Sequence, residues 1–179
     1  MLDGPYLAGC LLMVAAGMAK VYRPHDTARA VVEVLRMRST QRCLRTVPVL
    51  VRALAAAELA VGLAGASVPS SLSAGLVAAS YAGFSGFVLT ALVRKSPLAT
   101  CGCFAKTDTP PTVTHVVLTL GIAASATTVA ASARPGWSPL WTFVGHQPLH
   151  GIPMLLGAAA LAFVAWVAMT LLPAMRGAR

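Results

Sequence analysis

Five long apolar stretches follow one another along the chain, and polar residues gather in the segments between them. An α-helix needs about 20 apolar residues to cross the hydrocarbon core of a bilayer, and each stretch comes close to that length. We therefore predict an all-α membrane protein. Its transmembrane helices are expected over about residues 5–21, 47–66, 72–93, 113–131 and 152–172.

A further, amphipathic helix is predicted over residues 27–37, with Pro24 and Asp26 as a plausible start. Its apolar positions follow the spacing of one helix face: Ala28, Val31, Val32 and Leu35. The other face is charged: Arg29, Glu33 and Arg36. A helix of this kind is expected to lie in the membrane interface.

Composition agrees with a membrane protein, because 57% of the residues are hydrophobic and 11% are charged. Soluble domains carry about 25% charged residues. The N-terminus has Asp3 and no Lys or Arg before the first apolar stretch, whereas a secretory signal needs a positive start. The first stretch is therefore predicted to be a retained helix.

The net charge of +9 does not indicate nucleic-acid binding, because the basic residues lie in the segments between apolar stretches. Eight Lys or Arg residues lie within 20–52, three within 94–112, two after the last stretch, and Arg134 alone on the opposite side. The positive-inside rule then places the N-terminus outside and the C-terminus in the cytoplasm. The lipid bilayer, including its anionic headgroups, is the expected partner of this charge.

Three charged residues lie in or at the ends of the first two apolar stretches: Lys20, Arg52 and Glu58. A carboxylate inside a membrane is costly unless it is paired or neutral, so Glu58 is a functional candidate. We predict that the first two helices pack together and that Glu58 faces the bundle, toward Lys20 or Arg52. The alternative is an unpaired, protonated Glu58.

The third apolar stretch carries small residues at every fourth position: Gly75, Ala79 and Gly83. Such a row permits close contact between membrane helices. The polar side chains of Ser80, Tyr81 and Ser85 are expected to face the bundle.

The most reactive candidates are Cys101 and Cys103, which flank Gly102 and precede Phe104 in the loop after the third stretch. Two thiols at this spacing can form a strained disulfide, exchange a disulfide with a partner, or share a soft metal. They can also be two ordinary cysteines in a turn. The neighbouring basic residues would stabilise a reactive thiolate: Arg94, Lys95 and Lys106.

Three other residues are supporting candidates. His115 either caps its helix or contacts headgroups, or else it acts beside the two thiols. Cys43 lies in a basic setting but can be incidental, and Cys10 is expected toward the outer face. No metal site and no cofactor are evident, while a quinone or a soft metal remains open.

Three segments resemble known membrane families. The run Ala15-Ala16-Gly17-Met18-Ala19-Lys20 with Arg23-Pro24 is similar to the end of the first helix in DoxX-like proteins, and Ala57-Glu58-Leu59-Ala60-Val61-Gly62 is similar to their second helix. Tyr81 to Leu92, followed by Cys101-Gly102-Cys103-Phe104, resembles the methylamine utilisation protein MauE.

The resemblance implies a DoxX/MauE-like four-helix transmembrane bundle in the bacterial inner membrane over residues 1–132. A loop and one extra transmembrane helix would form 133–179. It also implies maturation of a disulfide-rich partner beside a thioredoxin-fold protein. Ala105 in place of a second glycine, the long basic loop and the extra helix depart from the family, so methylamine metabolism and another redox or maturation pathway both stay open.

We therefore predict a membrane protein of thiol–disulfide exchange or partner maturation, at most an enzyme that acts with a partner. One cysteine pair cannot carry electrons across the bilayer alone, and Cys10 on the far side is single. The alternatives are a non-catalytic accessory or assembly subunit of a membrane complex, and soft-metal handling.

Overall fold

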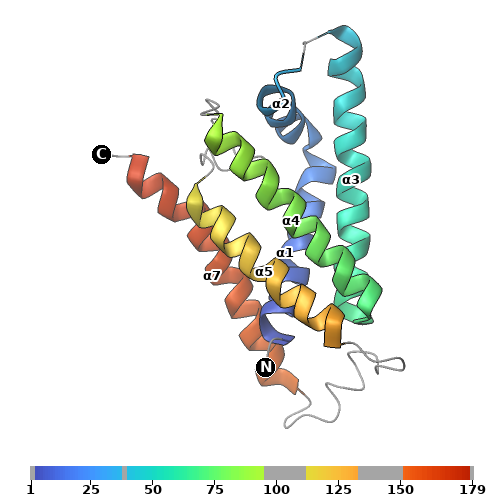
Figure 1. Ribbon diagram of the computed structural model, residues 1–179, viewed down its shortest axis with the longest axis vertical. Coiled ribbons are helices and arrows are strands. Elements are labelled where there is room, and N and C mark those ends of the chain that lie inside the picture. The colour runs from blue at the N-terminus through green and yellow to red at the C-terminus, as the bar shows by residue number, and fades with distance from the viewer. Residues whose placement is uncertain (1–2, 38–39, 95–111, 133–150, 178–179) are drawn as a thin grey trace.

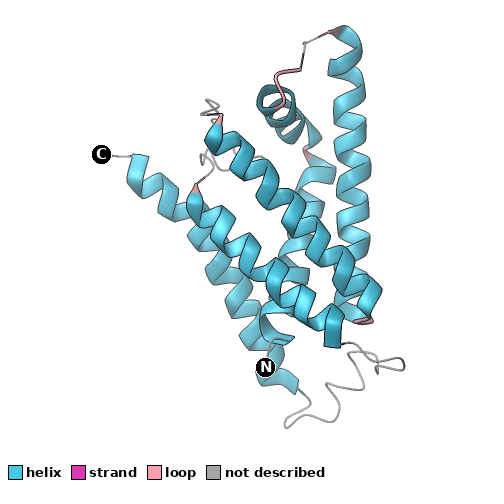
Figure 2. Ribbon diagram, viewed as in Figure 1, coloured by secondary structure: helices cyan, strands magenta, loops and turns pink. Residues whose placement is uncertain are grey.

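The computed structural model describes residues 3–37, 40–94, 112–132 and 151–177 (Figure 1). This part of the chain is helical and contains no strand (Figure 2). Its helices are α1 (Asp3–Tyr22), α2 (Pro24–Val34), α3 (Gln41–Ser67), α4 (Ser71–Val93), α5 (Val113–Ser132) and α7 (Ile152–Gly177). All except α2 are long and apolar enough to cross a membrane. The predicted all-α membrane protein is confirmed.

The starts of two helices differ from the sequence-based expectation, as do the ends of α2 at Val34 and of α7 at Gly177. Helix α3 begins at Gln41, well before residue 47, because Thr40 caps it: the Thr40 side chain accepts a hydrogen bond of 3.3 Å from the Cys43 N–H. The helix also continues through Pro48, which has no N–H to donate. Helix α2 begins at Pro24 rather than at residue 27, because proline suits the first helical position.

Helix α1 is the centre of the bundle and contacts α2, α3, α5 and α7, most extensively α3. The other large interface joins α4 to α5, and α3 also touches α4. The membrane-spanning helices alternate in direction, so the termini lie at opposite ends (Figure 1). We call the end that holds α2, the last turn of α1 and the first turn of α3 the α2 end. Arg94, which follows α4, also lies there, because its guanidinium contacts the Val34 carbonyl at the end of α2.

Glycines on α1 and α3 allow these two helices to approach closely. A Cβ atom at Gly17 would lie 3.0 Å from the Ala55 carbonyl oxygen and 3.1 Å from the Leu59 nitrogen. One at Gly62 would lie 3.1 Å from the Cys10 carbonyl oxygen. Backbone atoms cannot move aside as a flexible side chain can, so this interface requires glycine.

The row of small residues on α4 makes no close contact with the described residues. None of their atoms lies within 4 Å of a Cβ atom added at Gly75 or Gly83, and Ala79 is exposed. Helix α4 buries a different face, which includes Val77 and Val88. Small residues permit a close contact, but the position of the neighbouring helix decides which face is used.

Polar side chains of α4 do face the bundle, as expected from the sequence. Tyr81 and Ser85 are buried, and Ser80 is half-buried. The Tyr81 hydroxyl donates to the Gly9 carbonyl at 2.7 Å, and the Ser85 and Thr119 hydroxyls are 2.6 Å apart. Hydrogen bonds away from water are worth about 0.6 kcal/mol each between membrane helices, so these contacts help to fix α4 against α1 and α5.

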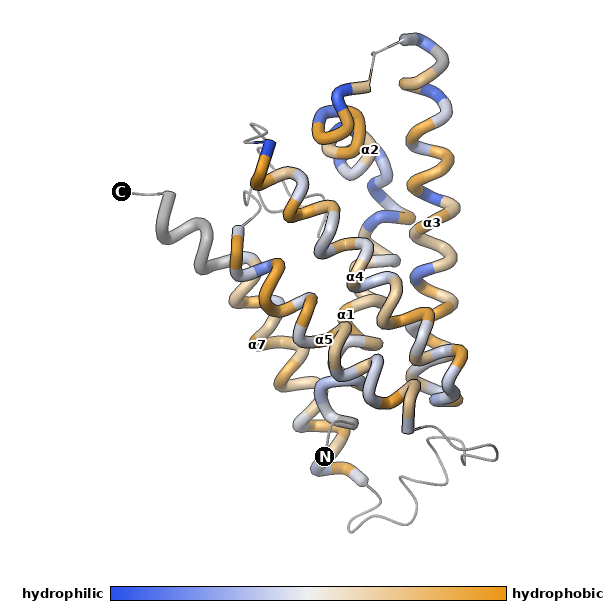
Figure 3. Tube along the Cα trace, viewed as in Figure 1, coloured by the Kyte–Doolittle hydropathy of each residue, from blue (hydrophilic) through white to orange (hydrophobic). Residues whose placement is uncertain are grey.

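The outward surface of the spanning helices is strongly apolar. Large side chains such as Leu54, Leu63, Leu89 and Phe163 are more than half exposed. Apolar residues cover much of the length of these helices, and hydrophilic residues concentrate near the α2 end (Figure 3). Exposed apolar area of this extent is covered by lipid in a membrane protein.

Replacing Gly17 with alanine is expected to destabilise the protein by about 1–3 kcal/mol, because the new methyl group overpacks the α1–α3 interface. The measurement is the thermal unfolding midpoint in detergent. Gly83→Ala is the matched control, since it adds the same methyl group to open space and should not lower the midpoint. Equal midpoints for the two variants would contradict the close packing at Gly17.

Candidate functional site

An ion pair lies between α1 and α3, close to the α2 end. Lys20 comes from the last turn of α1, and its Nζ lies 2.5 Å from Oε2 of Glu58 on α3. Their side chains are only 12% and 19% exposed. The close approach at Gly17, almost one turn before Lys20, brings the two helices near enough for this pair. The expected contact between Glu58 and Lys20 is therefore present, while Arg52 is exposed.

A small cavity of about 60 Å³ lies beside the ion pair. Its polar lining comes from Ser80, Tyr81 and Thr119 as well as from the pair itself. Typical small-molecule sites have about 300–1,000 Å³, so a space of this size suits water. The pair therefore adjoins a small space whose otherwise mainly apolar lining includes three hydroxyl groups.

The residues on either side of the α4–α5 connection, Arg94 and Thr112, both form hydrogen bonds to described residues. At its start, the Arg94 guanidinium donates a hydrogen bond of 2.7 Å from Nη1 to the Val34 carbonyl oxygen. Val34 is the last residue of α2, where carbonyl groups lack partners within the helix. Arg94 thereby ties the end of α4 to the end of α2.

At the other side of the connection, Thr112 and His115 cap the start of α5. The Thr112 N–H donates to Nδ1 of His115 at 3.3 Å, and the Thr112 hydroxyl lies 2.9 Å from the same atom. This resembles the side-chain half of a capping box. A neutral ring that accepts at Nδ1 carries its proton on Nε2. Of the two roles expected for His115, the structure shows the capping one.

Cys101, Gly102, Cys103 and Phe104 lie outside the described residues, and the role of His115 beside the thiols stays a prediction with them. The other two cysteines are described and are unbridged. Cys43 is half-buried in the first turn of α3 at the α2 end. Cys10 is fully buried against Gly65, toward the opposite end of α3.

No group of three or more His, Cys, Asp or Glu side chains that could hold a metal ion occurs in the described ranges.

Sequence reasoning missed two features of the α2 end. One is the bond from Arg94 to Val34, for which the sequence holds no signal. The other is an open cavity between α2 and α3, which depends on how the amphipathic helix is placed.

Residues 4–133 match the model of the family described as methylamine utilisation protein MauE. The chain belongs to the MauE family. No curated protein and no solved structure matches the chain.

Membership of the MauE family agrees with the helices described above, since the match includes the four spanning helices α1, α3, α4 and α5 and the short α2. Helix α7 lies beyond the match and packs against α1 and α5. The chain is thus a multi-pass membrane protein of a family whose description refers to methylamine utilisation.

Proposed function

We propose that this MauE-family protein exchanges disulfides with a partner protein through Cys101 and Cys103, and so takes part in the maturation of a redox protein. The observation that carries the proposal is the Cys-Gly-Cys spacing in a connection whose flanking residues, Arg94 and Thr112, are held by hydrogen bonds. Family membership supports the same proposal.

The exchange follows ordinary thiol–disulfide chemistry. One thiolate of the pair attacks a disulfide of a thioredoxin-fold partner, the partner's S–S bond breaks, and a mixed disulfide forms. The second cysteine then attacks the mixed disulfide and releases the partner as a dithiol. Two electrons and two protons pass to the partner, and Cys101 and Cys103 become a disulfide. The reverse reaction with another partner dithiol restores the pair.

Basic residues around the connection support thiolate chemistry. Arg94 lies at the bundle end, and Lys95 and Lys106 follow in the sequence. Positive charge stabilises the thiolate, which is the nucleophile in the exchange. Cys10 cannot serve as a second pair on the other side, because it is single and buried in the core.

The proposed location is the bacterial cytoplasmic membrane, with the N-terminus outside and the C-terminus inside. The asymmetry of Lys and Arg supports this orientation, since the basic segments adjoin the α2 end and Arg134 is alone in the connection between α5 and α7. The two cysteines would then meet their partner at the cytoplasmic surface.

Labelling with a membrane-impermeant maleimide tests the accessibility and the side of the thiols together. In a Cys10→Ser/Cys43→Ser background, reduced Cys101 and Cys103 are expected to react in inside-out vesicles and to stay unlabelled in right-side-out spheroplasts. Solubilised protein gives the full labelling signal as a control. Labelling in spheroplasts would reverse the orientation, and no labelling from either side would exclude exchange with a protein partner.

A further inference from the structure

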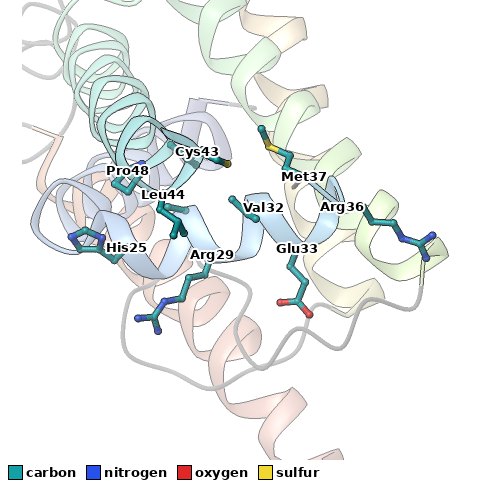
Figure 4. Close-up of a pocket in the computed structure, with 11 residues that line it drawn as sticks. His25, Arg29, Val32, Glu33, Arg36, Met37, Cys43, Leu44 and Pro48 are labelled. Atoms are coloured by element: carbon teal, nitrogen blue, oxygen red, sulfur yellow. The ribbon is translucent and has the colours of Figure 1, made fainter. Parts of the chain in front are cut away.

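A cavity of about 550 Å³ opens between α2 and α3 at the α2 end (Figure 4). It is separate from the small cavity beside Lys20 and Glu58, and nothing in the thiol chemistry uses it. Its volume falls in the range of about 300–1,000 Å³ that small-molecule sites occupy. The cavity is therefore large enough to hold part of an organic ligand.

The lining of the cavity is divided between apolar and basic side chains. Val32 of α2 and Leu44 and Val47 of α3 give it an apolar wall. Arg29 of α2 and Arg36, which follows α2, line the cavity at its rim, and both are exposed. In Figure 4, Val32 points to the side of α2 on which Leu44 lies, whereas Arg29 extends away from it. A ligand that fits this division has one charged end and one apolar end.

The two arginines are free to bind an anion. Glu33 also lines the cavity, but among the described residues it forms no ion pair with Arg29 or Arg36. Two guanidinium groups against one carboxylate leave a positive rim. Guanidinium groups match the geometry of phosphate oxygens, which they bind through paired N–H donors.

The backbone conformation of Arg36 is a second observation that favours a binding role for its side chain. Helix α2 ends in a Schellman motif, in which the Met37 N–H donates to the Val32 carbonyl and the Arg36 N–H to the Glu33 carbonyl. Arg36 occupies the left-handed position of this motif with a φ of 50°. Glycine is the usual residue there, and a side chain costs about 1 kcal/mol. The strain is retained at a residue that lines the cavity.

The position of the cavity relative to the membrane identifies the class of ligand. The candidate membrane span of α3 begins at Cys43, so Leu44 and Val47 lie in its first turns. The amphipathic helix α2 covers these turns from the outside of the bundle. A ligand that occupies the cavity therefore has its apolar part level with the acyl chains and its charged part level with the headgroups.

We propose that this cavity binds an anionic phospholipid, with its anionic headgroup at the rim that carries Arg29 and Arg36 and the start of an acyl chain against Leu44 and Val47. The bound lipid joins α2 to α3 and holds the amphipathic helix in place at the α2 end. A soluble phosphate compound would leave the apolar wall uncovered. A zwitterionic lipid would bring the same phosphate together with a cationic headgroup, which the basic rim repels.

Native mass spectrometry of the full-length protein tests the proposal, with phosphatidylglycerol and phosphatidylcholine of the same acyl chains as the probes. The wild type is expected to retain phosphatidylglycerol in preference to phosphatidylcholine. Each arginine near an anionic lipid strengthens binding about fivefold, so Arg29→Gln/Arg36→Gln is expected to lower that preference about 25-fold. Arg45→Gln/Arg52→Gln is the matched control, because both arginines are exposed on α3 outside the cavity.

Arg36→Gly separates lipid binding from folding, because glycine relieves the left-handed strain while it removes the guanidinium. This variant is expected to keep or raise the unfolding midpoint of delipidated protein and to lose about fivefold in lipid preference. An equal loss in the Arg45→Gln/Arg52→Gln control would mean general surface attraction and overturn the proposal, as would unchanged preference in the cavity variants. Displacement of the lipid by glycerol phosphate at equal concentration would also overturn it.

Discussion

Replacing Cys101 and Cys103 together with serine is expected to abolish the biological activity of the protein and to leave its fold intact. Serine keeps the size of each side chain but cannot form a disulfide, so no electrons pass to a partner. Both positions lie in the connection between α4 and α5, outside the described helices. This variant should therefore lose activity while it keeps the wild-type fold.

Complementation of a deletion strain measures the loss, scored by the growth or enzyme-maturation defect of the deletion. The double variant is expected to match the empty vector, while its membrane level and detergent melting curve match the wild type. Cys43→Ser is the matched control, because it removes one thiol at the same end of the bundle and should complement. Full complementation by the double variant would favour a non-catalytic accessory subunit instead.

Removing the carboxylate of Glu58 is expected to cause the largest loss of stability. Lys20 would then keep its charge in a site that is 12% exposed, with no partner for its ammonium group. Breaking a buried ion pair from one side costs about 3–5 kcal/mol, and the lower end applies here because both side chains retain some exposure. Glu58→Leu removes the charge and keeps a side chain of similar size, whereas Glu58→Ala also removes side-chain packing.

A double-mutant cycle distinguishes the ion pair from general disruption. Lys20→Met/Glu58→Leu removes both charges and is expected to be more stable than either single variant, because no isolated charge is left. Arg52→Gln changes an exposed charge on the same helix and should leave the unfolding midpoint unchanged. If the two single effects simply add in the double variant, the pair makes no energetic contribution.

Periodicity and length predicted the spanning helices because a bilayer imposes both requirements on the sequence. The start of α3 was missed because its first turn is basic and contains no long apolar run, so Gln41 to Thr46 were expected in a loop. The local signal was present in Thr40, whose side chain caps the helix. Thr40 could therefore have located a boundary that hydropathy did not.

Some contacts between helices could be predicted from the sequence, and others could not. The pair of Lys20 with Glu58 could be predicted because a charge in a membrane needs a partner, and few are available. The close contact at Gly17 could not be distinguished from the row at Gly75 and Gly83, since both have small residues at helical spacing. The cavity between α2 and α3 depends on the tertiary position of α2, about which its own amphipathic pattern says nothing.

The most direct test of the central claim is the redox titration of Cys101 and Cys103 in purified protein. Differential alkylation with mass spectrometry, across a series of reduced and oxidised glutathione, measures the fraction of the pair in the disulfide form. The proposed exchange predicts a reversible two-electron transition, in which both states are obtained and Cys10 stays unmodified in the core. Two thiols that never form a disulfide at any ratio would contradict the account, as would thiols that resist alkylation until a metal chelator is added.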